Sequence, residues 1–195
     1  MPGRRSTTVL LIIDVINDLN FPGGEKVLPW AVRMAERLVA FRDRARRAGV
    51  PVVYVNDNFG HWRANFTDVY RHCTRRGARG RAVVRRLKPG RDDYFVLKPR
   101  HSGFFATSLV PLLEDLGAKH LVLAGIATNL CVLFTAHDAH MHEYRVTVLS
   151  DCCAAESDHD HNEALSQLKR FCGAKVCTAD EMKLKRASAK KGSSR

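Results

Sequence analysis

The segment VLLIID, residues 9–14, decides how the chain folds. Val9 to Ile13 is an unbroken run of β-branched residues and leucines, which is typical of a strand buried on both faces of a sheet. The run ends at Asp14, a charged residue placed directly after the strand. A strand of this kind needs helices on both sides of its sheet, so the rest of the chain is expected to supply them.

The chain beyond this segment alternates helix-like and strand-like patterns. Pro29 opens a helical pattern, and Gly49 is expected to end it as a C-cap. Further strands are predicted at 51–55, 94–97, 121–124, 145–149 and 175–177, and further helices at 105–116, 129–142 and 159–171. This alternation predicts the α/β class: a three-layer α/β/α sandwich with a six-stranded parallel, Rossmann-like sheet. The irregular stretch 56–74 is expected to carry function or a subunit contact.

Length and composition indicate one domain in a reducing compartment. The 195 residues are 45% hydrophobic and 27% charged, as in ordinary globular proteins. We assign residues 1–182 to the domain and residues 183–195 to a basic tail that we expect to be disordered. The first apolar run is too short to span a bilayer and no signal-peptide pattern precedes it, so we expect a cytoplasmic protein. The six cysteines are expected to be free thiols.

The net charge of +12 raises the question of an anionic partner. Eleven of the 32 basic residues lie in 71–100, and the segment 71–91 is compatible with one helix that has a basic face. That face is either solvated, a subunit contact or a surface for nucleic acid. No Gly-rich phosphate loop and no known nucleic-acid motif accompanies it, so nucleic acid is not the favoured partner and a small-molecule substrate is.

Three reactive side chains are predicted to meet at one edge of the sheet. Ligands of open α/β sheets bind outside the carboxyl ends of the strands. Asp14 follows the first predicted strand, Lys98 the third, and Cys131 begins the helix after the fourth. With Thr128 as N-cap, the helix terminus and Lys98 are expected to lower the thiol pKa, while Asp14 accepts the proton. A buried cysteine at a strand–helix junction is the alternative interpretation of this position.

Four sequence blocks resemble the isochorismatase-like cysteine hydrolases. They read LLIIDVINDLNF (10–21), FVLKPRHSGFFATSL (95–109), LAGIATNLCVLFTAHDA (123–139) and YRVTVLSDCCAA (144–155). This superfamily includes nicotinamidases, N-carbamoylsarcosine amidases and ureidoacrylate amidohydrolases. The resemblance covers roughly residues 8–180, which is nearly the whole predicted domain.

The resemblance implies a cysteine-dependent amidohydrolase without a cofactor. It assigns the nucleophile to Cys131, the general base to Asp14 and the activating cation to Lys98. It further implies a cis peptide between Ile126 and Ala127, and an oxyanion hole formed by the backbone N–H groups of Ala127 and Cys131. By analogy, attack on an amide-like carbonyl releases ammonia or an amine and leaves a thioester for water to hydrolyse. The family also implies a homodimer or homotetramer.

Aromatic and amide side chains are expected to line the substrate pocket. The predicted substrate-binding residues are Asn20, Phe21, Asn58, Phe59, Trp62, Arg100, Phe104 and Ile126. Aromatic rings supply shape, the asparagines supply hydrogen bonds, and Arg100 with His101 suits a carboxylate or phosphate. The alternative is that the loop aromatics pack on a neighbouring subunit and that Arg100 forms a surface salt bridge. Whether Asp57 or His61 contacts the substrate stays open.

The same loop departs from the metal-binding pattern of the nicotinamidases. Those relatives hold a metal through an Asp-x-His motif after the second strand together with a further histidine. Here Asp57 is followed by Phe59 at the histidine position. The histidines at 137, 140 and 142 do not share one helix face at their spacing. We therefore predict no metal site, and nicotinamidase activity becomes a less favoured expectation.

Two other interpretations use the same fold. One is a binding protein that engages nucleic acid or an acidic partner through 71–91. The other is a family member that has lost turnover and acts as an interaction protein. The intact set of Asp14, Lys98 and Cys131 favours the enzyme.

Overall fold

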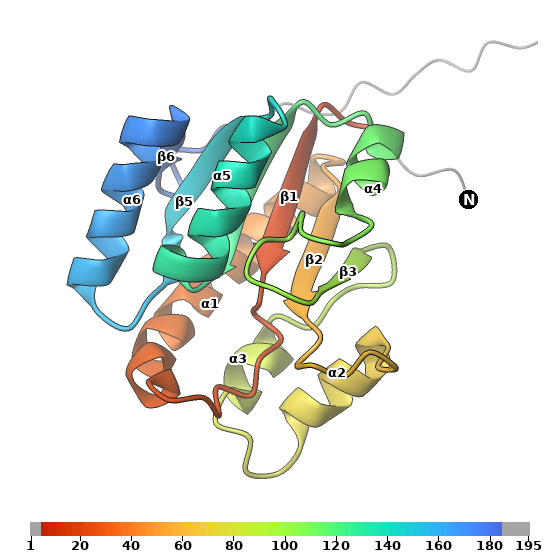
Figure 1. Cartoon of the computed structure of the whole chain (residues 1–195), viewed down its shortest axis with the longest axis vertical. Helices are drawn as coiled ribbons and strands as arrows, with labels where there is room; N and C mark the ends of the chain where they lie inside the picture. Colours follow the sequence, from red (N-terminus) through yellow and green to blue (C-terminus); the bar gives the residue numbers. More distant parts are fainter. Residues whose placement is uncertain (1–4, 185–195) are drawn as a thin grey trace, which may run out of the picture.

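A six-stranded parallel sheet forms the centre of the structure (Figure 1). The computed structural model describes residues 5–184. The strands are β1 (Thr8–Ile13), β2 (Val52–Asp57), β3 (Tyr94–Lys98), β4 (His120–Ile126), β5 (Arg145–Ala154) and β6 (Lys175–Cys177). They lie in the order β3-β2-β1-β4-β5-β6, and every neighbouring pair is parallel. All carboxyl ends therefore meet at one edge of the sheet.

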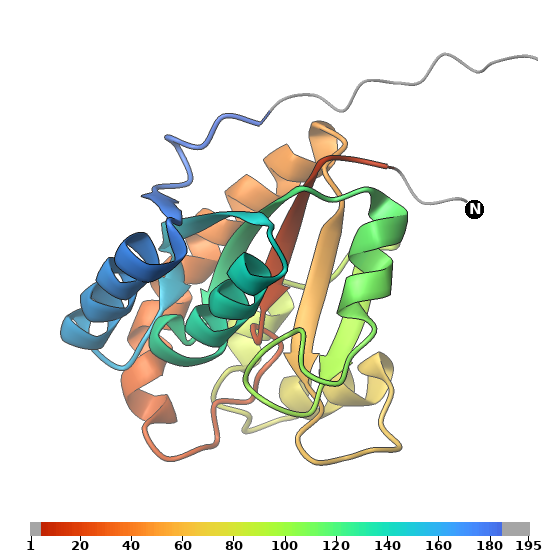
Figure 2. The same cartoon turned by 45° about the horizontal axis from the view of Figure 1, so that its top comes forward.

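Helices cover both faces of this sheet. They are α1 (Gly24–Arg47), α2 (Phe66–Thr74), α3 (Arg81–Arg86), α4 (Leu109–Leu116), α5 (Leu133–Met141) and α6 (Asp158–Cys172), with a π-helical turn η1 (Thr128–Val132) before α5. Leu10 and Ile12 pack with the apolar residues of α1, α2 and α3, whereas Leu11 and Ile13 pack with those of α4, α5 and α6. Figure 2 shows α4, α5 and α6 in front of the sheet and α1 behind it. The predicted three-layer α/β/α fold is confirmed.

The segment that predicted the fold is its most buried strand. Each of the residues from Val9 to Ile13 is 0% exposed. A fully buried aliphatic side chain contributes about 1.5–3 kcal/mol relative to an exposed one. The run also lies between two neighbours, because β1 pairs with β2 on one side and with β4 on the other. A continuous apolar sequence is therefore what this position requires.

A glycine allows β1 and β4 to approach closely at the carboxyl edge. Gly125 lies opposite Ile13 in the register and has a φ of +132°. A Cβ atom at this position would lie 2.0 Å from the carbonyl oxygen of Ile13. Only glycine fits there, because other residues have both the clash and the unfavourable φ. This approach brings the ends of the two strands, and thus Asp14 and the turn that follows β4, close together.

Two helix predictions are wrong at their boundaries. Helix α1 begins at Gly24 and not at Pro29, which lies inside the helix. The extra turn contains Val27, which is fully buried in the core, so burial extends the helix beyond the proline signal. The helix predicted at 105–116, in contrast, is shorter in the structure, where α4 begins only at Leu109.

The segment 71–91 is not one helix. It contains the end of α2 and all of α3, joined by a turn in which Gly77 has a positive φ of 86°. Gly80 donates its N–H to the carbonyl of Asp18 at 2.8 Å, and its Cα packs against the Asn17 carbonyl so closely that a Cβ would clash. Contact with the loop after β1 therefore interrupts the basic helix.

Two other segments are more regular than their sequences suggest. The stretch 56–74 contains helix α2. A reciprocal capping box between Asn65 and Asp68 stabilises the start of this helix. Strand β5 continues to Ala154, beyond the predicted end at residue 149. Its pairing with β4 shifts register between Leu123 and Gly125 and then resumes, with Ala154 opposite Ile126. Of the predicted tail 183–195, only Lys183 and Leu184 lie within the described residues.

None of the helices found between residues 5 and 184 has the length and apolar character required to cross a membrane.

Candidate active site

The carboxyl edge of the sheet brings together the three reactive side chains predicted from the sequence. Asp14 follows β1 directly, Lys98 is the last residue of β3, and Cys131 lies in η1 after β4. The Lys98 Nζ atom lies 2.7 Å from Asp14 Oδ2 and 3.6 Å from Cys131 Sγ. Because β2 separates β3 from β1, the long lysine side chain has to cross one strand to reach the carboxylate.

These three side chains are buried, so the charges of Lys98 and Asp14 must be paired. Lys98 is 0% exposed, Asp14 4% and Cys131 8%. A buried ammonium group is tolerated only where acceptors replace its water shell. Lys98 also donates to the carbonyl oxygen of Arg100 at 3.1 Å. The ammonium group is therefore held in one position, between a carboxylate and a thiol.

Sequence reasoning did not place the carboxylate of Asp57 beside Lys98. Asp57 ends β2, and its Oδ2 atom lies 3.7 Å from Lys98 Nζ. Its backbone N–H donates to Asp14 Oδ1 at 2.7 Å and so orients that carboxylate. The strand-end rule that found Asp14 and Lys98 would also have found Asp57, which lies at the end of the strand between theirs. Asp57 is therefore part of the charged cluster around Lys98.

The predicted lowering of the Cys131 thiol pKa is wrong. Burial raises the pKa of the Cys131 thiol, and the neighbouring Asp14 carboxylate raises it further, which outweighs the effect of Lys98. Burial likewise raises the pKa of Asp14, and Lys98 offsets this only in part. Burial opposes the charge on Lys98, but Asp14 and Cys131 outweigh it, so the pKa of Lys98 is raised. The pKa values of Asp14, Lys98 and Cys131 are therefore all raised, by burial or by their charged neighbours.

The turn that carries Cys131 differs from the predicted helix start. The N-cap of η1 is Ala127, and Thr128 does not cap, because its Oγ1 atom is 2.8 Å from Nδ1 of His161 on α6. The peptide bond between Ile126 and Ala127 is cis, as the family resemblance implied. The carbonyl oxygen of Ala127 accepts hydrogen bonds from the N–H groups of Leu130 and Val132.

Hydrogen bonds fix the loop after Lys98 to the helix after Cys131. The Thr135 hydroxyl donates to the carbonyl of Cys131 at 2.6 Å and accepts from the N–H of Gly103 at 3.0 Å. Ser102 donates to the Asp138 carboxylate on the same helix. Because Thr135 and Asp138 both lie on α5, the lysine and the thiol are parts of one connected unit.

His101 approaches the thiol more closely than the sequence indicated. Its Nδ1 atom lies 3.9 Å from Cys131 Sγ, and its ring packs on Phe134 at 5.6 Å between centroids. The guanidinium of its neighbour Arg100 is exposed and donates to the carbonyl of Pro99. Arg100 thus contributes its main-chain oxygen to the site, whereas His101 contributes a side chain.

The residues predicted for substrate binding differ in how they are placed. Asn58 is buried, but its side chain accepts from the N–H of Gly60 and thus stabilises the loop. Phe59 packs on His72, and Trp62 is 77% exposed. Asn20 is exposed, and its N–H donates to Asp18.

Three more predicted pocket residues have clearer packing roles. Phe104 was expected in the pocket wall, but its ring stacks on His142 at 5.0 Å and packs on Tyr144, beyond the carboxyl end of α5. Ile126 is buried at the end of β4. Phe21 is half-buried and packs against the core on the α1 side of the sheet.

The residues near Asp57 do not fit the metal centre of the nicotinamidases. Phe59 has no ligand atom where those relatives have a histidine, and its N–H donates to Asp57 Oδ1. The other Asp57 oxygen faces the Lys98 ammonium group, which repels a cation. Between residues 5 and 184 there is no group of three or more His, Cys, Asp or Glu side chains arranged to hold a metal.

The comparisons with known proteins agree with this fold. The model of the isochorismatase domain family matches residues 8–181, so the chain belongs to the isochorismatase family, and it is a hydrolase. An isochorismatase family protein of Bacillus subtilis is 35% identical over 178 residues, which are 91% of this chain and 97% of the relative. The ureidoacrylate amidohydrolase of Caulobacter vibrioides is 31% identical over 206 residues, with 92% of both chains covered.

A solved structure adds a comparison of the fold. The N-carbamoylsarcosine amidase of Thermoplasma acidophilum superposes with a TM-score of 0.68 at 27% sequence identity. The match covers 91% of this chain and 99% of that enzyme. The likeness therefore extends over the whole sheet and its helices.

Proposed function

We propose that this hydrolase cleaves an amide-like C–N bond of a small molecule through a thioester on Cys131. The observation that carries the proposal is the contact of one buried ammonium group, Lys98 Nζ, with both Asp14 Oδ2 and Cys131 Sγ. Burial raises the pKa of the Asp14 carboxylate, and the Cys131 thiol beside it is protonated. Asp14 is therefore suited to act as the general base that accepts the thiol proton. The reaction needs no metal in this scheme.

The first half of the reaction forms the thioester. Asp14 takes the thiol proton while Cys131 Sγ attacks the substrate carbonyl carbon, and Lys98 stabilises the sulfur anion as it forms. The N–H groups of Ala127 and Cys131 are assigned to the oxyanion of the tetrahedral intermediate. When the C–N bond breaks, the leaving nitrogen takes the proton from Asp14. Ammonia or an amine departs, and the acyl group stays on sulfur.

The second half restores the enzyme. Asp14, again a carboxylate, takes a proton from water as the water oxygen attacks the thioester carbonyl carbon. The C–S bond breaks, and the sulfur recovers a proton from Asp14. One water is consumed, and one acid and one amine or ammonia are released.

The substrate class comes from the relatives. By name, one of them acts on ureidoacrylate and another on N-carbamoylsarcosine, and both compounds carry a carbonyl between two nitrogens. We therefore place small ureido and N-carbamoyl acids first in a panel that also contains simple carboxamides. We also expect His101, whose Nδ1 atom lies 3.9 Å from Cys131 Sγ, to contact the substrate beside the reacting carbon.

Ammonia release from this panel tests the proposal. We expect turnover by the wild type, a loss of about 10³-fold or more for Cys131→Ala, and no comparable loss for Cys177→Ala on the edge strand β6. Quenching during turnover is expected to give a mass increase on the peptide that contains residue 131. Turnover that survives Cys131→Ala would disprove the thioester. Absence of turnover and of acylation across the panel would favour a non-catalytic family member.

A further inference from the structure

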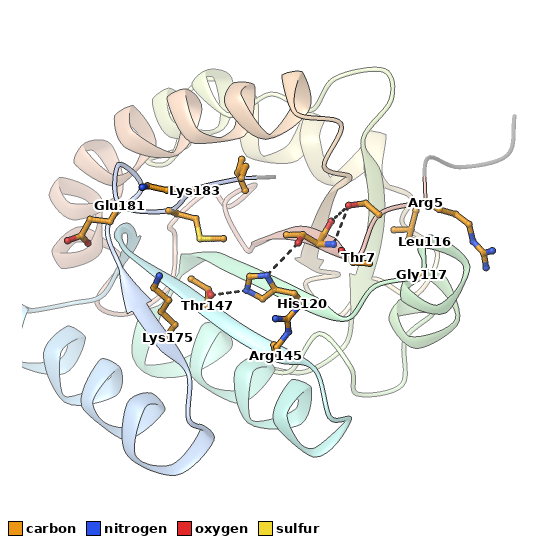
Figure 3. A pocket seen from close by; sticks show the side chains of 14 residues that line it. Arg5, Thr7, Leu116, Gly117, His120, Arg145, Thr147, Lys175, Glu181 and Lys183 are labelled. Carbon is orange, nitrogen blue, oxygen red and sulfur yellow. Dashed lines mark hydrogen bonds between the residues drawn. The ribbon is translucent and has the colours of Figure 1, made fainter. Parts of the chain in front are cut away.

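A second hollow lies at the amino end of the sheet, on the edge opposite the candidate active site (Figure 3). Its volume is about 970 Å³. The first residues of four strands contribute to it: Thr8, His120, Arg145 and Lys175. The segment that follows β6, through Met182, Lys183 and Leu184, forms the opposite wall.

The floor of this hollow carries polar groups where the strands are otherwise apolar. His120 Nε2 lies 2.8 Å from Oγ1 of Thr147, and His120 Nδ1 lies 3.5 Å from Oγ1 of Thr8. Thr147 is 2% exposed, so its hydroxyl is a buried polar group of the sheet. Three neighbouring strands thus present two hydroxyls and an imidazole to one space. Figure 3 shows the contact between His120 and Thr147 as a dashed line.

Positive charges surround this floor. The charged side chains that line the hollow are Arg5, Arg145, Lys175, Glu181 and Lys183. Glu181 is the one acid among these five residues, and one of its oxygens accepts from the N–H and the hydroxyl of Thr178. Four cations therefore stand against one carboxylate. Burial, together with Arg145 and Lys175, lowers the pKa of His120. The site therefore has a positive potential that its own residues do not neutralise.

Ion pairs show how far the cations of the hollow are neutralised within the protein. Seven arginines elsewhere form ion pairs with aspartate or glutamate. In the part of the chain that the structure describes, Arg145, Lys175 and Lys183 have no such partner. Four cations that gather around a concave polar floor with a single carboxylate beside them fit an anionic ligand.

We propose that this hollow binds a small molecule that carries two or more phosphate groups. Arginine and lysine recognise phosphate oxygens, and threonine hydroxyls with an imidazole supply further hydrogen bonds at the floor. The volume lies in the range of ordinary ligand sites, and the concave shape favours a compact ligand over a nucleic-acid backbone. The site is separate from Cys131, so the proposal does not depend on the hydrolase chemistry.

Calorimetric titration of the full chain with inorganic pyrophosphate at 150 mM salt tests the proposal. We expect saturable binding by the wild type and a weakening of about tenfold or more in Arg145→Gln/Lys175→Gln. The matched control is Arg76→Gln/Arg85→Gln, which removes the same charge from exposed positions around α3 and is expected to bind within about twofold of the wild type. A thermal melt of each variant checks that it is folded.

Three results would overturn the proposal. The first is no saturable binding by the wild type, and the second is equal weakening in both double variants. The third is binding of a short DNA duplex, but not of pyrophosphate, that is lost in the full-length Lys185→Gln/Arg186→Gln variant and kept in Arg145→Gln/Lys175→Gln. Such a result would place the anion on the basic tail.

The His120 side chain reports where the ligand lies. A bound anion should raise the lowered pKa of this imidazole, since it offsets Arg145 and Lys175. In nuclear magnetic resonance titrations we expect pyrophosphate to shift the ring signals of His120 and to leave those of His61, in the loop after β2, unchanged. Unchanged His120 signals at saturating pyrophosphate would exclude this site.

Discussion

Lys98 carries the electrostatics of the candidate active site. Its ammonium group is fully buried and lies 2.7 Å from one Asp14 oxygen. A buried pair of this kind costs desolvation on both sides, and removing one partner leaves the other uncompensated. The Lys98 nitrogen also contacts the Cys131 thiol. The Lys98–Asp14 ion pair therefore affects the pKa values of all three side chains.

The first prediction separates thiol reactivity from turnover. Asp14→Asn removes the negative charge that raises the pKa of the Cys131 thiol and leaves Lys98 facing the sulfur. We expect faster alkylation of Cys131 by iodoacetamide at neutral pH than in the wild type, while turnover falls by about 10²–10⁴-fold. Peptide mass spectrometry at several times measures the labelling. Slower labelling in Asp14→Asn would show that the carboxylate activates the resting thiol.

The second prediction concerns the acid limb of the pH–rate profile. Asp14 must be ionised to accept the thiol proton, and burial raises its pKa despite the opposing effect of Lys98. Activity should therefore rise with pH through this raised pKa, which lies above the value of about 3.9 for a free aspartate. Measurement of kcat/KM between pH 4 and 8 locates the limb. We expect Asp57→Asn to leave its position nearly unchanged, and an acid limb near pH 4 would contradict the assignment.

At the scale of elements, strand order explains why the site forms. Loops after β1, β2, β3 and β4 converge because these strands are neighbours in the sheet and parallel. The loop after β3 comes from the edge strand, and hydrogen bonds to α5 hold it over the site. The site therefore depends on the helix after β4 as much as on the strands.

The third prediction tests this connection. Thr135→Val removes the hydroxyl that joins the Gly103 N–H to the Cys131 carbonyl and leaves a buried N–H without a partner. We expect a loss of about 1–3 kcal/mol in the free energy of unfolding and a lower kcat. Thr135→Ser retains the hydroxyl and serves as the control. Urea denaturation with steady-state kinetics measures both effects, and equal behaviour of the two variants would contradict the role given to the hydroxyl.

At the scale of the whole molecule, apolar side chains are exposed on the surface of η1 and α5. Leu130, Phe134 and Met141, in η1 and α5, are 39%, 48% and 72% exposed. Apolar side chains that gather on one helix usually contact another chain or a ligand. The family resemblance independently led us to expect a homodimer or homotetramer, so this surface is where we place the contact.

The fourth prediction is therefore an oligomer that depends on α5. We expect light scattering coupled to size-exclusion chromatography to give a mass of at least twice 21.9 kDa for the wild type. Phe134→Glu/Met141→Glu should shift the protein towards the monomer, because charges would be buried in the contact. Asn162→Glu/Ser166→Glu adds the same charge to exposed positions of the neighbouring α6 and is expected to leave the mass unchanged. A monomeric wild type would contradict the prediction.

Sequence alone determined much of this protein, and the reason is local. The apolar run from Val9 to Ile13 predicted a buried central strand, because five consecutive apolar side chains are stable only where both faces of the strand are covered; all five are 0% exposed. The alternation of strands and helices predicted the sheet, and the strand-end rule predicted that Asp14, Lys98 and Cys131 would meet. These features depend on periodicity and chain order, which a sequence displays directly.

Tertiary structure decided the features that depend on distances between remote segments. The raised pKa of Cys131 results from burial and from Asp14, 117 positions earlier in the chain, so helix position predicted the wrong direction. The contact of Asp57 with Lys98 and the approach of His101 to the sulfur also join separate segments. The polar floor of the second hollow does so too, since Thr8, His120 and Thr147 lie on three strands. Protonation and binding follow from three-dimensional proximity, which residue types and spacing do not specify.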